Sequence, residues 1–220
     1  MMNDGILVEL IKSKQYDKAL ELLFKAIDEE PAEANHYINA GTILADANKL
    51  EEAERFFQKA LTLDETHGGA YYGLANIYFN HERYQESATL YQKAVAHGLE
   101  DADTFYMLGM SFVNLGDFKT AMPYLMRSYE MKPADTEVGF QYGLVLCQLE
   151  MYSEAVTVLT EVLAEEPDHT DARYNLALAR YMQDEDIEQA LDSFREITEL
   201  QPDHLLAGHA IKMFEQLKEG

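Results

Sequence analysis

The sequence predicts an all-α fold: one domain of six stacked helix pairs, closed by an unpaired helix at the C-terminal end. Three observations predict it. The chain repeats itself at a step of 34 residues, both halves of each repeat place apolar residues three and four apart, and proline closes four of the six units. With 47% hydrophobic residues among 220, the chain also has enough apolar material for a core.

The repeat is clearest in two segments that lie 34 residues apart, Ala-Tyr-Tyr-Gly-Leu-Ala-Asn-Ile-Tyr at 70–78 and Thr-Phe-Tyr-Met-Leu-Gly-Met-Ser-Phe at 104–112. In the first half of each unit, the same step connects a slot for small residues: Gly41, Ala75, Gly109, Gly143 and Ala177. In the second half it connects a small slot (Ala19, Ala53, Ser87, Ala121, Ala155, Ala190) and a large slot (Leu23, Phe57, Tyr91, Leu125, Leu159, Phe194).

Each half of a unit predicts one helix, because its apolar residues share one helical face. Small residues allow the two helices to approach closely, and junctions as short as 48–49 leave room only for a tight turn between antiparallel neighbours. The expected units are 1–33, 34–67, 68–101, 102–135, 136–169 and 170–204, followed by a capping helix at 205–220. Proline then blocks helix continuation at Pro31, Pro133, Pro167 and Pro202.

These residues resemble the tetratricopeptide repeat, whose pattern is W-x2-L-G-x2-Y, then A-x3-F, then P. The matching residues are Tyr71, Leu74, Ala75, Tyr78, Tyr91 and Ala94 in one unit, and Phe105, Leu108, Gly109, Phe112, Ala121 and Pro133 in the next. Six units cover nearly all of the chain, as in bacterial-type multi-repeat scaffolds of this family. The resemblance implies a right-handed α-solenoid that acts as a protein-interaction scaffold and carries no catalytic residues.

Some residues depart from the pattern. Pro123 lies inside a second-half helix, where we expect a bend because proline removes a backbone hydrogen bond. Ser87 and Ser128 replace alanines, and we expect their hydroxyls to bond to the preceding turn of their own helices. Arg173 and Arg180 occupy apolar slots, and their side chains are expected to extend along apolar surface toward nearby acids.

The two ends of the chain predict caps. The first helix is expected to be short, with Ile6, Leu7, Leu10 and Ile11 as its apolar residues. The last helix mixes apolar with polar residues and is expected to present a polar outer face that prevents end-to-end association. Its apolar members are Leu205, Leu206, Ile211, Phe214 and Leu217.

The candidate binding surface is the side of each first-half helix that the intra-unit packing does not use. Rings and aliphatic residues recur there at the 34-residue step, interleaved with amides, and such a surface suits a peptide because an amide pairs with both N–H and C=O of a backbone. The candidate groove residues are Asn39, Tyr72, Asn76, Phe79, Tyr106, Met107, Met110, Phe140, Gln141, Leu144, Tyr174, Asn175 and Leu178. The alternative is that these rows, beginning with Ile38, pack between neighbouring first-half helices as core.

Charge indicates the kind of partner. With 17 Lys and Arg against 40 Asp and Glu, the net charge is −23, which excludes a basic nucleic-acid reader and favours a partner with basic residues flanking an apolar motif. Solubility alone is the alternative explanation of the acid. No Lys or Arg accompanies the groove rows, so a clamp for a terminal carboxylate is not expected. Acidic residues along the expected groove edges are Asp4, Asp46, Asp103, Glu137 and Asp171.

The sequence predicts no catalytic, cofactor or metal site. The seven histidines form no zincin pair, no phosphate loop or nucleophile elbow occurs, and Cys147 lies in an apolar row. No run approaches the roughly 18 to 20 apolar residues of a membrane span, and the first residues lack a basic signal region, so a cytoplasmic protein is expected.

The predicted function is therefore a non-catalytic protein-interaction adaptor that binds a peptide segment or partner protein in the groove. The alternative function is a structural module that homo-oligomerises through the groove or through an incompletely capped end.

Overall fold

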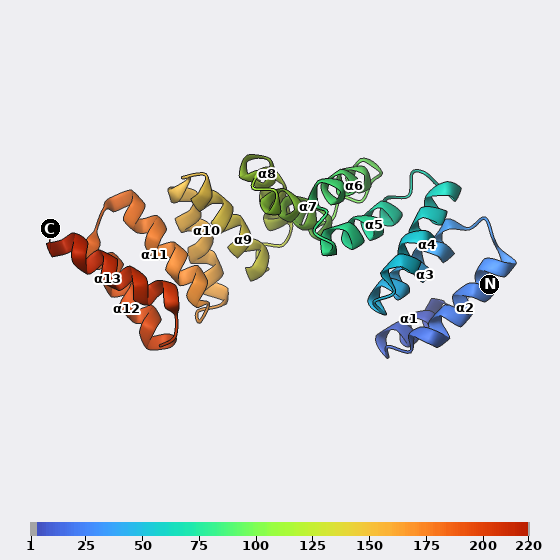
Figure 1. Cartoon of the computed structure of the whole chain (residues 1–220), viewed down its shortest axis with the longest axis horizontal. Helices are drawn as coiled ribbons and strands as arrows, with labels where there is room; N and C mark the ends of the chain where they lie inside the picture. The colour runs from blue at the N-terminus through green and yellow to red at the C-terminus, as the bar shows by residue number, and fades with distance from the viewer. Residues whose placement is uncertain (1–3, 220) are drawn as a thin grey trace. The chain divides into compact units, whose positions relative to one another are not determined.

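The computed structural model describes residues 4–219, except for the side chain of Asp4. Within this range the chain forms thirteen α-helices, which confirms the predicted all-α fold of six pairs and a final helix (Figure 1). The helices are α1 (Asp4–Lys12), α2 (Tyr16–Glu29), α3 (Ala34–Asp46), α4 (Leu50–Leu63), α5 (Gly68–Asn80), α6 (Tyr84–Ala96), α7 (Ala102–Asn114), α8 (Phe118–Met131), α9 (Thr136–Gln148), α10 (Tyr152–Glu165), α11 (Thr170–Asp184), α12 (Ile187–Leu200) and α13 (Leu205–Glu219).

The chain divides into two compact units, residues 1–115 with α1 to α7 and residues 116–220 with α8 to α13. In the first unit, a core of small and large apolar residues runs through α1 to α5, with Leu23, Ile43 and Phe57 almost fully buried. In the second unit, one core cluster surrounds Leu159, and another joins Phe194 to Phe214 of the last helix.

Close helix approach in the pairs α3–α4 and α9–α10 depends on the small slot, as predicted. A β-carbon on Gly41 would lie 3.0 Å from the ring of Phe57 in α4, and one on Gly143 would lie 2.7 Å from the side chain of Leu159 in α10. Both glycines are buried against the large residue of their own pair. The small and large slots of the sequence are therefore the two sides of one contact.

The turn inside each pair contains one residue with a positive φ, which lets the chain reverse within three residues. These residues follow the same step as the repeat: Lys14, Asn48, Glu82, Gly116, Glu150 and Glu185. Gly116 is the glycine among them. The last pair is one residue longer than the others and its turn is one residue shorter, so its first helix α11 has 15 residues where α9 has 13.

First-half helices begin with a side-chain cap in most pairs. The side chains of Glu33, Asp101, Asp135 and His169 each accept a hydrogen bond from a backbone N–H of the first turn. His204 does the same directly before α13, where the N–H of Ala207 donates to its Nδ1 over 3.1 Å. Two of the histidines near helix ends, His169 and His204, are thus helix caps.

The predicted hydrogen bond of Ser87 is wrong. Its buried hydroxyl donates to the carbonyl of Ala75 in the neighbouring helix α5 over 3.0 Å, and it lies 3.3 Å from the hydroxyl of Ser111 in α7. Ser87 therefore connects three helices, because the small slot faces the partner helix and brings its backbone within reach.

Helix α8 continues through Pro123 and spans residues 118 to 131. The Arg173 side chain extends toward Glu196, with Nη1 of the arginine 3.9 Å from Oε2 of the glutamate.

The last helix differs from the expected polar cap. Ala207, Ala210 and Phe214 of α13 are buried, so the helix does cover the end of the core. Its outer side, however, exposes four large apolar residues, Leu205, Leu206, Met213 and Leu217. None of the helices in residues 4–219 is long and apolar enough to cross a bilayer.

Candidate functional site

The thirteen candidate groove residues lie on five first-half helices, α3, α5, α7, α9 and α11. Every one of them is partly buried. They are neither sealed in the core nor fully exposed, whereas Ile38 at the start of the first row is 9% exposed and belongs to the core. The core alternative therefore holds for Ile38, and each candidate residue keeps some surface for a ligand.

In the first unit, Tyr72 and Asn76 of α5 line a pocket of about 300 Å³. Thr42 and Asp46 of α3 line it as well, and Leu50 and Phe57 of α4 complete it. Helix α5 ends at Asn80, which is also a pocket residue. The structure thus brings together two of the predicted residues with side chains from three consecutive helices.

Asn76 is held in place by Tyr91 of α6. The buried Tyr91 hydroxyl donates a hydrogen bond to Oδ1 of Asn76, and the Tyr72 ring meets the Tyr91 ring edge to face at 5.6 Å. Burial raises the pKa of Tyr91 well above its usual range, so the phenol stays protonated and keeps donating. Within the described residues, Nδ2 of Asn76 makes no hydrogen bond, so this group is available to a peptide carbonyl.

The other candidate residues of the first unit are on α3, α5 and α7. Phe79 packs edge to face on Tyr84 with ring centres 5.3 Å apart. Tyr106, Met107 and Met110 lie on α7 and are partly buried. Two thioethers beside an aromatic ring make an adaptable apolar surface.

In the second unit, the aromatic candidates contact histidines at the helix starts. The Phe140 ring lies 4.5 Å from that of His169, and the Tyr174 ring lies 5.7 Å from that of His204. Burial raises the pKa of Tyr174. Leu178 packs with Tyr174 against the C-terminal core cluster, and Leu144 is partly buried on α9.

The amides of the second unit are partly used by their own helices. Nε2 of Gln141 donates to Oε1 of Glu137 over 3.0 Å, and Nδ2 of Asn175 donates to the carbonyl of Asp171 over 2.8 Å. Each amide therefore keeps its oxygen for a ligand. Sequence reasoning expected both groups of each amide to face a ligand, and it missed that the residue four positions earlier on the same helix face is in reach.

Leu50 and Phe57 are pocket residues that sequence reasoning missed. The candidate rows follow the first-half helices, and both residues belong to the second-half helix α4. The signal was present, since Phe57 lies in the large slot that faces the first-half helices. Asp46, which was expected at a groove edge, lines the same pocket.

A metal site is not evident in the part of the chain that the structure describes, where no three His, Cys, Asp or Glu side chains gather as ligands would. Cys147 is partly buried, and burial raises the pKa of its thiol to about 11. Such a thiol behaves as a small apolar side chain near neutral pH.

Comparison with known proteins identifies the family. Residues 9–194 match the family described as cilia and flagella-associated protein 70 C-terminal domain, a family of tetratricopeptide repeats. The chain is also 41% identical to YrrB, described as a TPR protein with an unusual peptide-binding site, over 88% of this chain and 100% of YrrB, with a TM-score of 0.85. The chain belongs to the tetratricopeptide-repeat family.

More distant structures share the fold of this tetratricopeptide-repeat protein. PilF of Pseudomonas aeruginosa matches with a TM-score of 0.74 and 15% identity, over 96% of this chain and 94% of PilF. MamA matches with a TM-score of 0.69 and 18% identity, over 77% of this chain and 92% of MamA. No curated protein matches the chain. Fold and family together support a protein-interaction scaffold.

Proposed function

We propose that this tetratricopeptide-repeat protein is a non-catalytic adaptor that binds a peptide segment of a partner protein on its first-half helices. The pocket between α3, α4 and α5 carries the proposal, because Tyr72 and Asn76 line it together. A ring supplies contact area and an amide with an open Nδ2 supplies a donor for a backbone carbonyl. YrrB, a relative at 41% identity, is described as having a peptide-binding site, which supports the same class of ligand.

The net negative charge gives the adaptor a preference for basic ligands. A net charge of −23 repels anionic ligands and attracts basic ones, and this attraction weakens as salt rises. The expected ligand is an apolar motif with Lys or Arg beside it. Rings and methionines on α7 accommodate several apolar side chains, so the apolar part is expected to tolerate variation.

A library of random linear peptides displayed on phage tests the proposal. Peptides selected on the intact chain are synthesised, labelled, and titrated by fluorescence polarisation against a variant with Tyr106→Ala and Phe140→Ala. Because anchor residues cost about 2 kcal/mol or more on truncation, we expect Kd to rise roughly 30-fold or more. Circular dichroism and urea unfolding establish that the variant is folded.

The matched control replaces two exposed apolar residues of a second-half helix, Met126→Ala and Met131→Ala. This control is expected to bind the selected peptides as tightly as the parent chain. Equal loss of affinity in both double variants would contradict binding on the first-half helices.

A second candidate function, self-assembly, is favoured by one observation. Helix α13 leaves Leu205 86% and Leu206 56% exposed, with Met213 and Leu217 also exposed on the same helix. Exposed apolar residues on a terminal helix are a potential contact for a second copy. Light scattering across a range of concentrations separates the two functions: an adaptor keeps its monomer mass, whereas a self-assembling chain gains mass and loses that gain when Leu206→Lys and Met213→Lys are introduced.

A further inference from the structure

The pocket of the first unit combines apolar walls with one carboxylate. Leu50, Phe57 and Tyr72 supply the apolar part, and Asp46 supplies the charge. In the described part of the chain, no cation forms an ion pair with Asp46, and its side chain is exposed. A basic side chain has the matching form, because its long apolar stem carries the charge at the tip.

The helix dipoles of the backbone add to the negative electrostatic potential at the pocket. Asp46 is the last residue of α3, and Asn80 is the last residue of α5. Both helices therefore bring their C-terminal ends to the pocket, and the C-terminal end of a helix carries the negative part of its dipole, which favours a cation. The start of α4, which is the positive end of that helix's dipole, lies there as well at Leu50, and the carboxylates of Glu51 and Glu52 in its first turn offset it.

Charged side chains beside the pocket also favour a cationic ligand. A second cavity of about 450 Å³ shares Leu50 with the pocket and is lined by Lys49, Glu51, Glu52 and His81. The two cavities that share Leu50 thus contain three carboxylates, those of Asp46, Glu51 and Glu52, against one lysine. An incoming cation meets a local excess of negative charge in a protein whose net charge is already −23.

We propose that this pocket is the subsite for a basic side chain, Arg or Lys, of the bound peptide. The stem of that side chain packs on Leu50 and Tyr72, and its charged tip lies at Asp46. The Tyr72 ring adds a cation–π contact, which an arginine makes best because its guanidinium is planar. The inference rests on the proposed peptide-binding function and names a residue type that the bound peptide must contain.

Nα-acetyl-arginine N-methylamide is the probe, since it carries one basic side chain on a short stretch of backbone. Its neutral isostere, Nα-acetyl-citrulline N-methylamide, is the ligand control. In two-dimensional NMR titrations at low salt, we expect the arginine compound to shift the backbone amides around Asp46, Asn76 and Asn80 in a saturable way, with Kd in roughly the millimolar range for a ligand of this size. The citrulline compound is expected to leave them unchanged.

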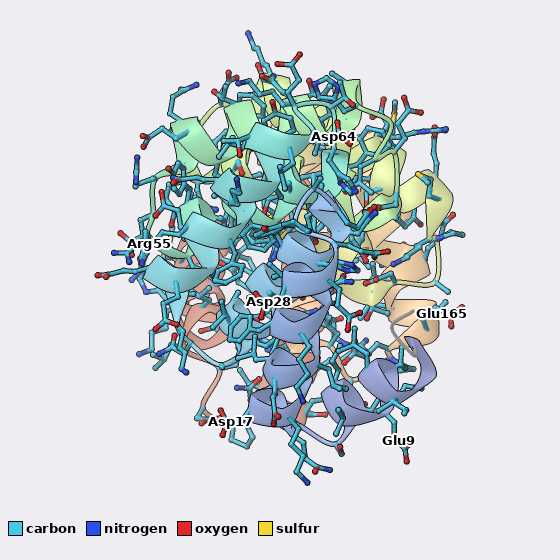
Figure 2. All side chains as sticks on the ribbon, turned by 90° about the vertical axis from the view of Figure 1, so that its right-hand side faces the viewer. Glu9, Asp17, Asp28, Arg55, Asp64 and Glu165 are labelled. Carbon is cyan, nitrogen blue, oxygen red and sulfur yellow. The ribbon has the colours of Figure 1, made fainter. Side chains whose placement is uncertain are left out.

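The matched protein variants are Asp46→Asn and Asp28→Asn. Asp28 is also an exposed aspartate, on α2 (Figure 2). Because an exposed pair contributes modestly, Asp46→Asn is expected to weaken arginine binding roughly fivefold, and Asp28→Asn is expected to leave it unchanged. No saturable shift near Asp46, equal shifts with citrulline, or equal losses in both variants would overturn the subsite.

This experiment can fail independently of the proposed function. If selected peptides bind and lose affinity with Tyr106→Ala and Phe140→Ala, while the arginine probe does not bind at Asp46, the subsite is wrong and the adaptor function stands. If the probe binds at Asp46 while that double variant retains peptide affinity, the anchoring role of Tyr106 and Phe140 is wrong and the cation pocket on α3 and α5 stands.

Discussion

The ring of Phe57 fills the space that a β-carbon on Gly73 would occupy. A β-carbon there would lie 2.3 Å from Cζ of the ring, and one on Gly41 would lie 3.0 Å from the same ring. Phe57 of α4 is thus enclosed by glycines from α3 and α5, one in its own repeat and one in the next. The same ring lines the pocket proposed for a basic side chain, so the core packing and the proposed subsite share one residue.

We therefore expect Gly73→Ala to destabilise the chain. The added methyl group cannot fit without moving a fully packed ring, and such overpacking costs typically about 1 to 3 kcal/mol. Urea unfolding followed by circular dichroism measures the change. Gly208→Ala in α13 is the control, because a β-carbon there meets nothing within 4 Å, and alanine favours a helix over glycine by up to about 1 kcal/mol. The two variants should change stability in opposite directions, and a shared direction would contradict the packing.

Tyr91→Phe removes the hydroxyl that donates to Asn76. Because the phenol is buried, we expect a loss of about 1 kcal/mol in unfolding free energy, the usual net value of one hydrogen bond. Tyr152→Phe is the matched control, since the Tyr152 hydroxyl makes no hydrogen bond within the described residues. Thermal unfolding of both variants compares them directly. A Tyr91→Phe protein as stable as the Tyr152→Phe protein would show that the bond to Asn76 contributes nothing.

His204→Ala removes the cap of the last helix. The N–H of Ala207 then loses its acceptor at Nδ1, and loss of a cap costs typically about 1 kcal/mol. His204→Asn is expected to recover most of the stability, because asparagine is a good neutral cap and adds no charge near Asp171, whose Oδ1 lies 3.3 Å from Nε2 of His204. Unfolding midpoints in urea test the pair. If His204→Asn and His204→Ala unfold at the same urea midpoint, His204 stabilises the chain through packing of its imidazole and not through capping.

Burial of Cys147 predicts slow alkylation and a pH-dependent loss of stability. Its pKa rises from an ordinary value near 9 to about 11, so at pH 8 the reactive thiolate should be about 100-fold scarcer than in the unfolded chain. The unfolded thiol loses its proton at lower pH than the folded one, so the contribution of Cys147 to stability falls as pH rises from about 9 to 11. Iodoacetamide rates of the native and urea-unfolded chain, compared at pH 8, measure this directly. Equal rates would contradict the burial.

The helices and their pairing could be predicted from the sequence because each depends on a local period. Gly41 and Leu159 occupy recurring slots, and the structure places both where those slots require. The hydrogen bond from Ser87 to Ala75 could not be predicted in the same way. A period shows which face of a helix is buried, but it does not show which backbone carbonyl of the partner helix lies opposite a given hydroxyl.

The candidate site was predictable only in part for a similar reason. Partial burial of Tyr72 and Asn76 follows from their place on the first-half helices. Leu50 and Phe57 come to the same pocket from the second-half helix between α3 and α5, and this depends on how three helices meet. The cap at His204 is a further example, because a histidine before a helix accepts a bond only in one ring orientation.

The left-handed turn residues, spaced like the repeat itself from Lys14 to Glu185, have a consequence for how such a chain changes length. A segment cut between two equivalent turns, for instance after Glu82 and after Gly116, carries a complete reversal at its junction. When that segment is duplicated or deleted, the new junction again lies at a turn with the same backbone geometry. The row of helix pairs can therefore be lengthened or shortened by whole repeats without a new type of connection.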